Sequence, residues 1–282
     1  MMHQTSSGMM KVVSGGLGQR LEGFWLSLLS RLAGDCVWVD VDGLRFYGSA
    51  KHQTYLHRLV RGSFEPFKME LFKEAIKPQM VVIDVGAYVG YHTVLASRLS
   101  GPQGKVYAFE CDPRNYRFLV HNVKLNNCTN VAARPRAVGD KAGVMTFSLE
   151  EDPSTSNFGH HGARALLSEV ECASLDEMLG GQPVDVVKMS IQGGECRALQ
   201  GMEKTLARQA KVLLFVECSP ATLRHAGASV DALLGQLHQL GFSVQVIDEN
   251  ERRLKAVGEE TYAERNAGGR KNFVYLYCSK DG

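Results

Sequence analysis

The chain has 282 residues, of which 44% are hydrophobic and 22% charged, and its formal net charge of +2 argues against an electrostatic nucleic-acid binder with a concentrated basic face. Its seven cysteines are widely spaced and include no Cys-x-x-Cys pair, so we expect no metal site and a reducing, cytoplasmic location. No apolar run approaches the roughly 18 to 20 residues of a transmembrane helix, so we expect no membrane span.

Residues 1–64 are predicted to form an N-terminal extension to a main domain at residues 65–282. After a disordered start, apolar residues recur at helical spacing between Leu21 and Leu32. This pattern predicts an amphipathic helix that covers the core or a second subunit of a homodimer. Two alternating apolar runs then flank Asp42-Gly43, which favours a tight type I′ turn in a β-hairpin.

The main domain begins with a helix that contains Met69, Phe72 and Ile76 and ends before Pro78. From Met80 onward, short apolar runs alternate with helical patterns, which favours βαβ units and a parallel sheet covered on both faces. We expect strands at 81–83, 105–109, 131–138, 184–189 and 212–216, and helices at 91–99, 112–126, 198–206 and 230–237.

Two additional strands interrupt this alternation. They are expected at 144–149 and 166–172, around a polar loop at 150–164 that we interpret as a flap. At the end of the chain, the runs 242–247 and 273–278 have no strong helical pattern between them, so an antiparallel pair at the end of the sheet is the natural interpretation.

The loop Asp84-Val85-Gly86-Ala87-Tyr88-Val89-Gly90 joins the first predicted strand of the sheet to a helix. Gly86 and Gly90 have no Cβ atoms, so a ligand can approach the backbone, and the helix start presents unpaired N–H groups to an anionic group. By themselves these residues are also compatible with an ordinary tight strand-to-helix turn.

Glu110 ends the next strand, twenty residues after Gly90, which is the spacing expected for an acid that binds ribose hydroxyls. A nucleoside ligand is therefore indicated. The loop lacks a Gly-x-Gly pair and places the anionic Asp84 where a dinucleotide would have its pyrophosphate. The positively charged ammonium group of S-adenosylmethionine suits a position beside Asp84 better than the negatively charged pyrophosphate of a nicotinamide cofactor does.

These residues resemble the FkbM-type family of S-adenosylmethionine-dependent methyltransferases over roughly residues 65–248. The matching segments follow one another in the family's order: 82–87 with 90–93, 106–110 with 112–115, Asn122 with 125–126, 137–140, 174–176 and 184–188.

The resemblance implies an α/β, Rossmann-like, seven-stranded and mostly parallel sheet of the class I methyltransferases. It implies that Asp84, Gly86, Ala87 and Gly90 hold the methionine part of the cofactor, that Glu110 holds the ribose, and that the adenine pocket is lined by Ala137 and Val138. We add the neighbouring residues Tyr91, His92, Cys111 and Ser190 to the predicted cofactor contacts. Family members generally methylate hydroxyl groups of sugars, lipids or polyketide-like metabolites, so the resemblance implies a small-molecule hydroxyl acceptor.

The sequence departs from the family in the segment 188–195, where Ser190 and Gln192 replace two carboxylates. Transfer to a hydroxyl requires an aligned oxygen and, unless the hydroxyl is already acidic, a general base. Serine alone is no such base, so Glu217 at the end of the fifth strand is our first candidate, with Ser190 beside it. His160 and His161 in the flap are alternatives.

Three functions remain open from the sequence. The leading one is a small-molecule O-methyltransferase. The second is a catalytically altered or inactive S-adenosylmethionine-binding protein, because of Ser190 and Gln192. The third is an RNA or protein methyltransferase, against which the mild charge argues, so nucleic acid is not an expected partner.

Overall fold

The computed structural model describes residues 11–12, 36–49, 52–149, 166–258 and 273–280. The helix predicted between Leu21 and Leu32 and the loop that contains His160 and His161 lie outside these ranges.

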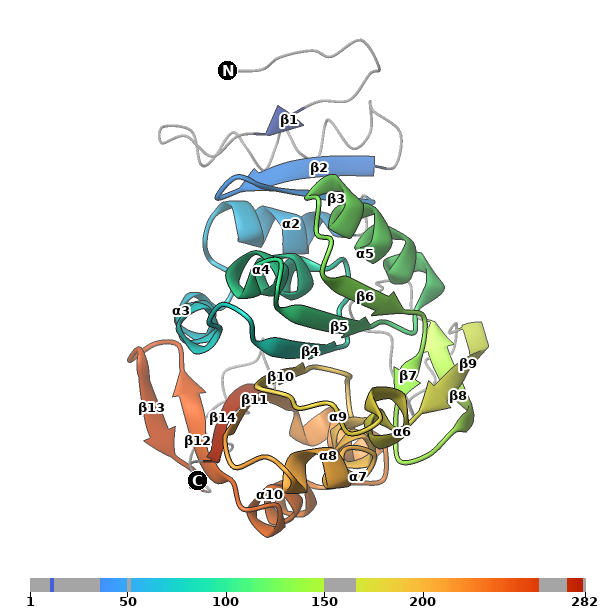
Figure 1. Cartoon of the computed structure of the whole chain (residues 1–282), viewed down its shortest axis with the longest axis vertical. Helices are drawn as coiled ribbons and strands as arrows, with labels where there is room; N and C mark the ends of the chain where they lie inside the picture. Colours follow the sequence, from blue (N-terminus) through green and yellow to red (C-terminus); the bar gives the residue numbers. More distant parts are fainter. Residues whose placement is uncertain (1–10, 13–35, 50–51, 150–165, 259–272, 281–282) are drawn as a thin grey trace.

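The central sheet contains eight strands: β4 (Val81–Val85), β5 (Lys105–Phe109), β6 (Val131–Arg134), β10 (Val186–Met189), β11 (Val212–Cys218), β12 (Ser243–Asp248), β13 (Arg253–Ala256) and β14 (Val274–Lys280). Their order is β13-β12-β14-β11-β10-β4-β5-β6 (Figure 1). The strands from β11 to β6 are parallel, whereas β14, β12 and β13 pair antiparallel. The predicted Rossmann-like α/β sheet is therefore confirmed, as is the antiparallel pair at its end.

The sheet has one strand more than the seven that the resemblance implied. The additional strand β13 pairs with β12 and is formed by the charged segment that follows it. It is an edge strand in which Arg253 and Ala256 are exposed and Leu254 and Lys255 are half-buried. Charged side chains on an edge strand disfavour pairing with another chain, which is why this segment did not show the apolar alternation of a buried strand.

Helices lie on both sides of the sheet (Figure 1). One side has α2 (Gln53–Val60), α3 (Pro66–Ala75), α4 (Tyr91–Ser100) and α5 (Pro113–Leu125), and the other has α6 (Leu175–Leu179), α7 (Glu195–Gln200), α8 (Glu203–Ala207), α9 (Pro220–His225) and α10 (Val230–Gln239). Because strand side chains alternate, Val82 belongs to the apolar cluster under the first set and Ile83 to the cluster under the second. Within the described ranges, no helix has the length and apolar character needed to cross a membrane.

The predicted helix at 198–206 is interrupted in the structure. It divides into α7 and α8 around Gly201, where a Cβ atom would lie 1.8 Å from the carbonyl oxygen of Gly139. This contact joins segments far apart in the chain, so the apolar spacing of the segment did not reveal the break. The short helices α2, α6 and α9 were also not predicted.

The N-terminal hairpin consists of β2 (Cys36–Val41) and β3 (Leu44–Ser49), with β1 (Lys11–Val12) paired alongside β2. Asp42 and Gly43 both have positive φ, 52° and 76°, which confirms the turn predicted from the Asp-Gly pair. The hairpin is fixed to α5 through Asn122, whose amide accepts from Tyr47 N at 2.7 Å and donates to Tyr47 O at 2.9 Å.

The two strands predicted around the flap are also present. β8 (Gly143–Leu149) and β9 (Leu166–Ala173) are antiparallel neighbours in a small sheet with β7 (Ala137–Val138). The single strand expected at 131–138 is therefore two pieces, since β6 stays in the central sheet and β7 joins the flap strands.

The chain order of the strands reverses direction at the middle of the sheet. From β4 the chain proceeds outward through β5 and β6, then crosses to the other side of β4 and continues through β10 and β11. The loops that follow β4 and β10 meet at the carboxyl edge, where Ser190 N donates to Val85 O at 3.0 Å, and this edge is where open α/β sheets bind their ligands. The predicted site residues lie at this edge.

Candidate active site

The loop after β4 is held by the neighbouring strand. The backbone N–H groups of Gly86 and Ala87 both donate to the carbonyl oxygen of Phe109, each at 2.9 Å, and Gly90 N donates to Ala87 O at 2.8 Å. Gly90 then caps the N-terminus of α4 without a side-chain hydrogen bond. The predicted strand, loop and helix start are thus brought together as the sequence indicated.

The two glycines of this loop are required by contacts within the chain. Gly86 has φ of +78°, and a Cβ atom there would lie 2.0 Å from the carbonyl oxygen of Ser190. At Gly90, with φ of +93°, a Cβ atom would lie 2.8 Å from Leu119 Cδ1. A side chain at Gly86 would therefore push the loops after β4 and β10 apart.

Asp84 forms a buried ion pair with Lys188, its register partner on β10. Its Oδ1 atom lies 3.1 Å from Lys188 Nζ, and its Oδ2 atom accepts from Thr93 Oγ1 at 2.6 Å. Lys188 Nζ donates hydrogen bonds to the carbonyl oxygens of Gly86, at 2.6 Å, and Val85, at 3.5 Å. Among the described residues, the buried Asp84 Oδ1 atom has this ion pair but no hydrogen-bond donor.

Glu110 lies next to the same loop. Its Oε2 atom accepts from Tyr88 N at 2.7 Å and its Oε1 atom from Asp112 N at 2.9 Å. The residue is buried, and burial raises the pKa of its carboxyl to about 7, against the lowering effect of these two backbone N–H groups. Tyr88 reaches Glu110 from a left-handed backbone, with φ of 54°.

The other predicted cofactor residues pack in three different apolar clusters. Cys111 packs against a small apolar cluster that contains Ala137, while Val138 belongs to the core on the opposite side. Tyr91 packs edge-on against Phe46 of the hairpin, with ring centroids 5.3 Å apart.

His92 is buried, and its Nε2 atom lacks a hydrogen-bond partner in the described part of the chain. Burial and the nearby ammonium groups of Lys68 and Lys188 hold the pKa of the His92 imidazole well below its usual range, so the ring is neutral near pH 7.

Glu217, at the end of β11, accepts hydrogen bonds from three side chains. Ser190 Oγ and Tyr275 OH donate to its Oε2 atom, the latter at 3.3 Å, and Gln192 Nε2 donates to Oε1 at 2.8 Å. The two residues that replace family carboxylates are therefore both donors to one carboxylate. Burial is the main cause that raises the pKa of Glu217.

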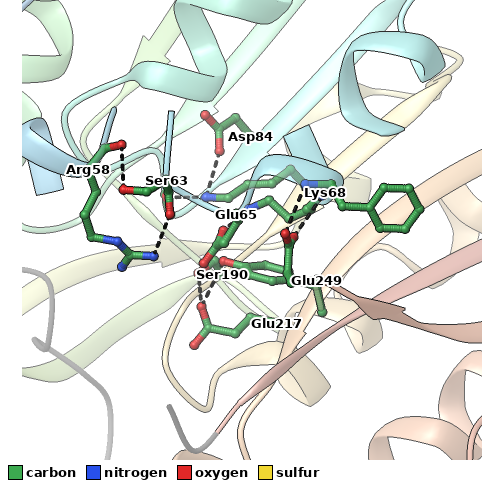
Figure 2. A network of polar contacts seen from close by, with 12 residues as sticks. Arg58, Ser63, Glu65, Lys68, Asp84, Ser190, Glu217 and Glu249 are labelled. Carbon is green, nitrogen blue, oxygen red and sulfur yellow. Dashed lines mark hydrogen bonds and ion pairs between the residues drawn. The ribbon is translucent and has the colours of Figure 1, made fainter. Parts of the chain in front are cut away.

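Helix α3 brings a second ion pair to the same region (Figure 2). Lys68 Nζ lies 2.6 Å from Glu65 Oε2 and 3.8 Å from the centroid of the Tyr275 ring. Lys68 is 0% exposed, and burial lowers the pKa of its ammonium group. Sequence reasoning missed Glu65, Lys68, Tyr275 and the pairing of Lys188.

The buried cluster contains three carboxylates, from Glu65, Asp84 and Glu217, and two ammonium groups, from Lys68 and Lys188. With every group ionised, one negative charge is unbalanced, and Asp84 Oδ1 lacks a donor. Buried charges without partners are costly. The carboxylate oxygens of this cluster therefore fit a ligand that carries a positive charge and an N–H group to donate.

Glu195, in the first turn of α7, holds the loop that precedes this helix. Its Oε1 atom accepts from Ile191 N at 3.1 Å and its Oε2 atom from Gly193 N at 2.9 Å. It thereby holds the loop 190–194 in the conformation that directs Ser190 and Gln192 toward Glu217.

A family model described as the methyltransferase FkbM domain matches residues 84–244, more than half of the chain. That range contains the loop after β4, Glu110, Ser190 and Glu217.

Two curated proteins match short segments. A tRNA (guanine(37)-N(1))-methyltransferase 1 of Phaeodactylum tricornutum is 30% identical over 81 residues, 28% of this chain and 19% of that protein. A tRNA(Phe) (4-demethylwyosine(37)-C(7)) aminocarboxypropyltransferase of Methanocaldococcus jannaschii is 43% identical over 51 residues, 18% of this chain and 20% of that protein. The matches thus span about a fifth of the length of each relative.

Among solved structures, a precorrin-6y C5,15-methyltransferase of Geobacter metallireducens GS-15 superposes with a TM-score of 0.44 and 16% identity, covering 77% of this chain and 89% of that one.

Proposed function

Because the chain belongs to the FkbM family of S-adenosylmethionine-dependent methyltransferases, we propose that it binds this cofactor at the loop after β4 and transfers its methyl group to a hydroxyl of a small molecule, sugar or natural product. We take residues 65–282 as the catalytic domain and residues 1–64 as an extension, whose hairpin of β2 and β3 packs on that domain.

The cofactor contributes an activated methyl group on a positively charged sulfur. Asp84 Oδ1 and the carbonyl groups of the loop would accept hydrogen bonds from the ammonium of its methionine part, which Gly86, Ala87, Gly90, Tyr91 and His92 would surround. Glu110 would accept from the ribose hydroxyls. Cys111, Ala137 and Val138 would hold the adenine ring. The unbalanced negative charge of the buried cluster supports this placement.

Glu217 is the general base of the proposed reaction. The O–H bond of the acceptor would break and its proton would pass to a carboxylate oxygen of Glu217. The acceptor oxygen would form its bond to the methyl carbon as the bond from that carbon to the cofactor's sulfur breaks, which leaves a neutral thioether as the leaving group. Ser190 orients this carboxylate together with Gln192 and Tyr275. Burial raises the pKa of Glu217, which makes its carboxylate a stronger base than an exposed one.

The proposal depends on one observation: at the carboxyl edge of β11, the Glu217 carboxylate accepts hydrogen bonds from three side chains. Aspartate and glutamate at positions 190 and 192 would place three carboxylates together, whereas Ser190 and Gln192 leave Glu217 as the acceptor of their hydrogen bonds. This supports an altered but working site over an inactive one.

The test is to incubate the full chain with methyl-labelled S-adenosylmethionine and a metabolite extract of its host, and to look for labelled small molecules. Labelling that is lost in Glu217→Gln supports the proposal. Cofactor binding without labelling, together with labelling in Ser190→Asp, would establish the inactive alternative instead.

A second candidate is methylation of RNA, because both curated relatives named above are enzymes that modify tRNA. A parallel incubation with total RNA distinguishes the two. Label in the RNA fraction that falls as salt concentration rises would replace the small-molecule acceptor with a nucleic acid.

A further inference from the structure

The buried pair Glu65–Lys68 is connected to the candidate base through Tyr275 and does not belong to the family motifs. Glu65 caps the N-terminus of α3 in a left-handed backbone conformation, with φ of 47°, and is 4% exposed. A non-glycine residue in this conformation is uncommon. It directs the Glu65 carboxylate inward, where Lys68 Nζ lies 2.6 Å from it.

The first turn of α3 is itself fixed from the far end of the sheet. Glu249, in the turn between β12 and β13, accepts from Phe67 N at 3.0 Å and from Lys68 N at 2.9 Å (Figure 2). A carboxylate at a helix N-terminus satisfies unpaired N–H groups and interacts favourably with the helix dipole. Glu249 therefore holds Lys68 in place above the Tyr275 ring.

A continuous set of contacts leads from this pair to Glu217. Lys68 Nζ lies 3.8 Å from the centroid of the Tyr275 ring, and the hydroxyl of the same ring donates to Glu217 Oε2 at 3.3 Å. An ammonium group over the ring face is an attractive cation–π contact, which fixes the ring and hence its hydroxyl.

We propose that Glu65 and Lys68 are positioning residues that orient Tyr275 on Glu217 and set the pH range in which Glu217 accepts a proton. This inference rests on the proposed role of Glu217 as the base. The groups that face Glu217 are Glu65 and Lys68 on α3, Lys188 on β10, Glu195 on α7 and Tyr275 on β14.

The signs of the two contributions are opposite. The negative charge of Glu65 raises the pKa of Glu217, and the positive charge of Lys68 lowers it. Removing the charge of Glu65 must therefore extend the ionised range of Glu217 to lower pH, whereas removing the charge of Lys68 must restrict it to higher pH. If Glu65 and Lys68 only pack against their neighbours, neither substitution changes the pH at which Glu217 ionises.

The experiment follows the protonated-carboxyl infrared band of the full chain as a function of pH, with Glu217→Gln subtracted to isolate Glu217. In Glu65→Gln, which keeps an acceptor for Lys68, we expect the midpoint to fall by about one pH unit; in Lys68→Met we expect a rise of similar size. In the double variant, the midpoint should lie between those of the two single variants. Lys68→Arg keeps the positive charge, so its midpoint should stay near that of the unchanged chain.

Lys73→Met is the matched control, because Lys73 lies on the same helix with a half-exposed side chain that pairs with Asp42. Its midpoint should not move. If Lys68→Met does not fold, Glu65→Gln decides alone. Calorimetric titration with S-adenosylmethionine accompanies each variant. An unmoved midpoint in Glu65→Gln that still binds the cofactor overturns this inference and leaves the proposed function standing. If the unchanged chain does not bind S-adenosylmethionine, the proposed function is overturned instead.

Discussion

Replacing Gly86 with alanine should destabilise the chain by about 2–5 kcal/mol. The left-handed φ of +78° accounts for about 1–2 kcal/mol of this. The remainder, about 1–3 kcal/mol, comes from overpacking, since the new Cβ atom would lie 2.0 Å from the Ser190 carbonyl oxygen and both loops would have to move.

Gly43→Ala separates these two causes. Gly43 has nearly the same φ, +76°, but a Cβ atom there meets nothing within 4 Å. Urea unfolding of both variants should show a loss of about 1–2 kcal/mol for Gly43→Ala and a loss larger by about 1–3 kcal/mol for Gly86→Ala. Equal losses would refute the conclusion that Gly86 is required by the loop after β10.

Three further predictions concern the charged groups. Because the pKa of Glu110 is about 7, its ionised form becomes available as pH rises through 7, so the Kd for S-adenosylmethionine should increase below that pH. Glu110→Gln should weaken S-adenosylmethionine binding about tenfold to a hundredfold and remove the pH dependence of the Kd. A Kd that does not change with pH in the unchanged chain would contradict the role of the Glu110 carboxylate in binding. Lys188→Met should destabilise the fold by about 3–5 kcal/mol in urea unfolding, because Asp84 then keeps a buried charge without its partner. Adding Asp84→Asn to that variant should recover part of the lost stability. If the losses of the two single variants simply add, the two residues are not a coupled pair. Ser190→Asp should raise the pKa of Glu217 and shift any methyl transfer to higher pH, because it adds a carboxylate beside Glu217 Oε2; an unchanged pH profile would show that the contact is not made in solution.

Local sequence signals were sufficient for most of the central sheet. Asp112-Pro113 predicted the start of α5, where Asp112 accepts from Arg114 N at 2.8 Å. The Asp42-Gly43 turn was equally local. Both predictions depend on residues adjacent in the chain, which is why they needed no knowledge of the tertiary structure.

The features that were missed depend on contacts between distant segments. The break at Gly201 arises from the carbonyl group of Gly139, and the position of Lys68 depends on Glu249 and Tyr275. A usable signal existed for Lys188. A lysine within an apolar strand needs a buried partner, and Asp84 is the matching lone charge on another strand of the same sheet.

For the candidate site, strand order explains both the successes and the omissions. Asp84, Ser190 and Glu217 each end a parallel strand, so a sheet of the predicted type brings them to one edge. Glu65 comes from a helix and Tyr275 from an antiparallel strand, and no pattern in the sequence fixes where these meet the parallel strands.

The proposed cofactor site can be tested by calorimetric titration of the full chain with S-adenosylmethionine. We expect saturable binding at one site per chain, shared with the demethylated product and weakened in Asp84→Asn and Glu110→Gln. Absence of binding by either compound, in a chain shown to be folded, would contradict it.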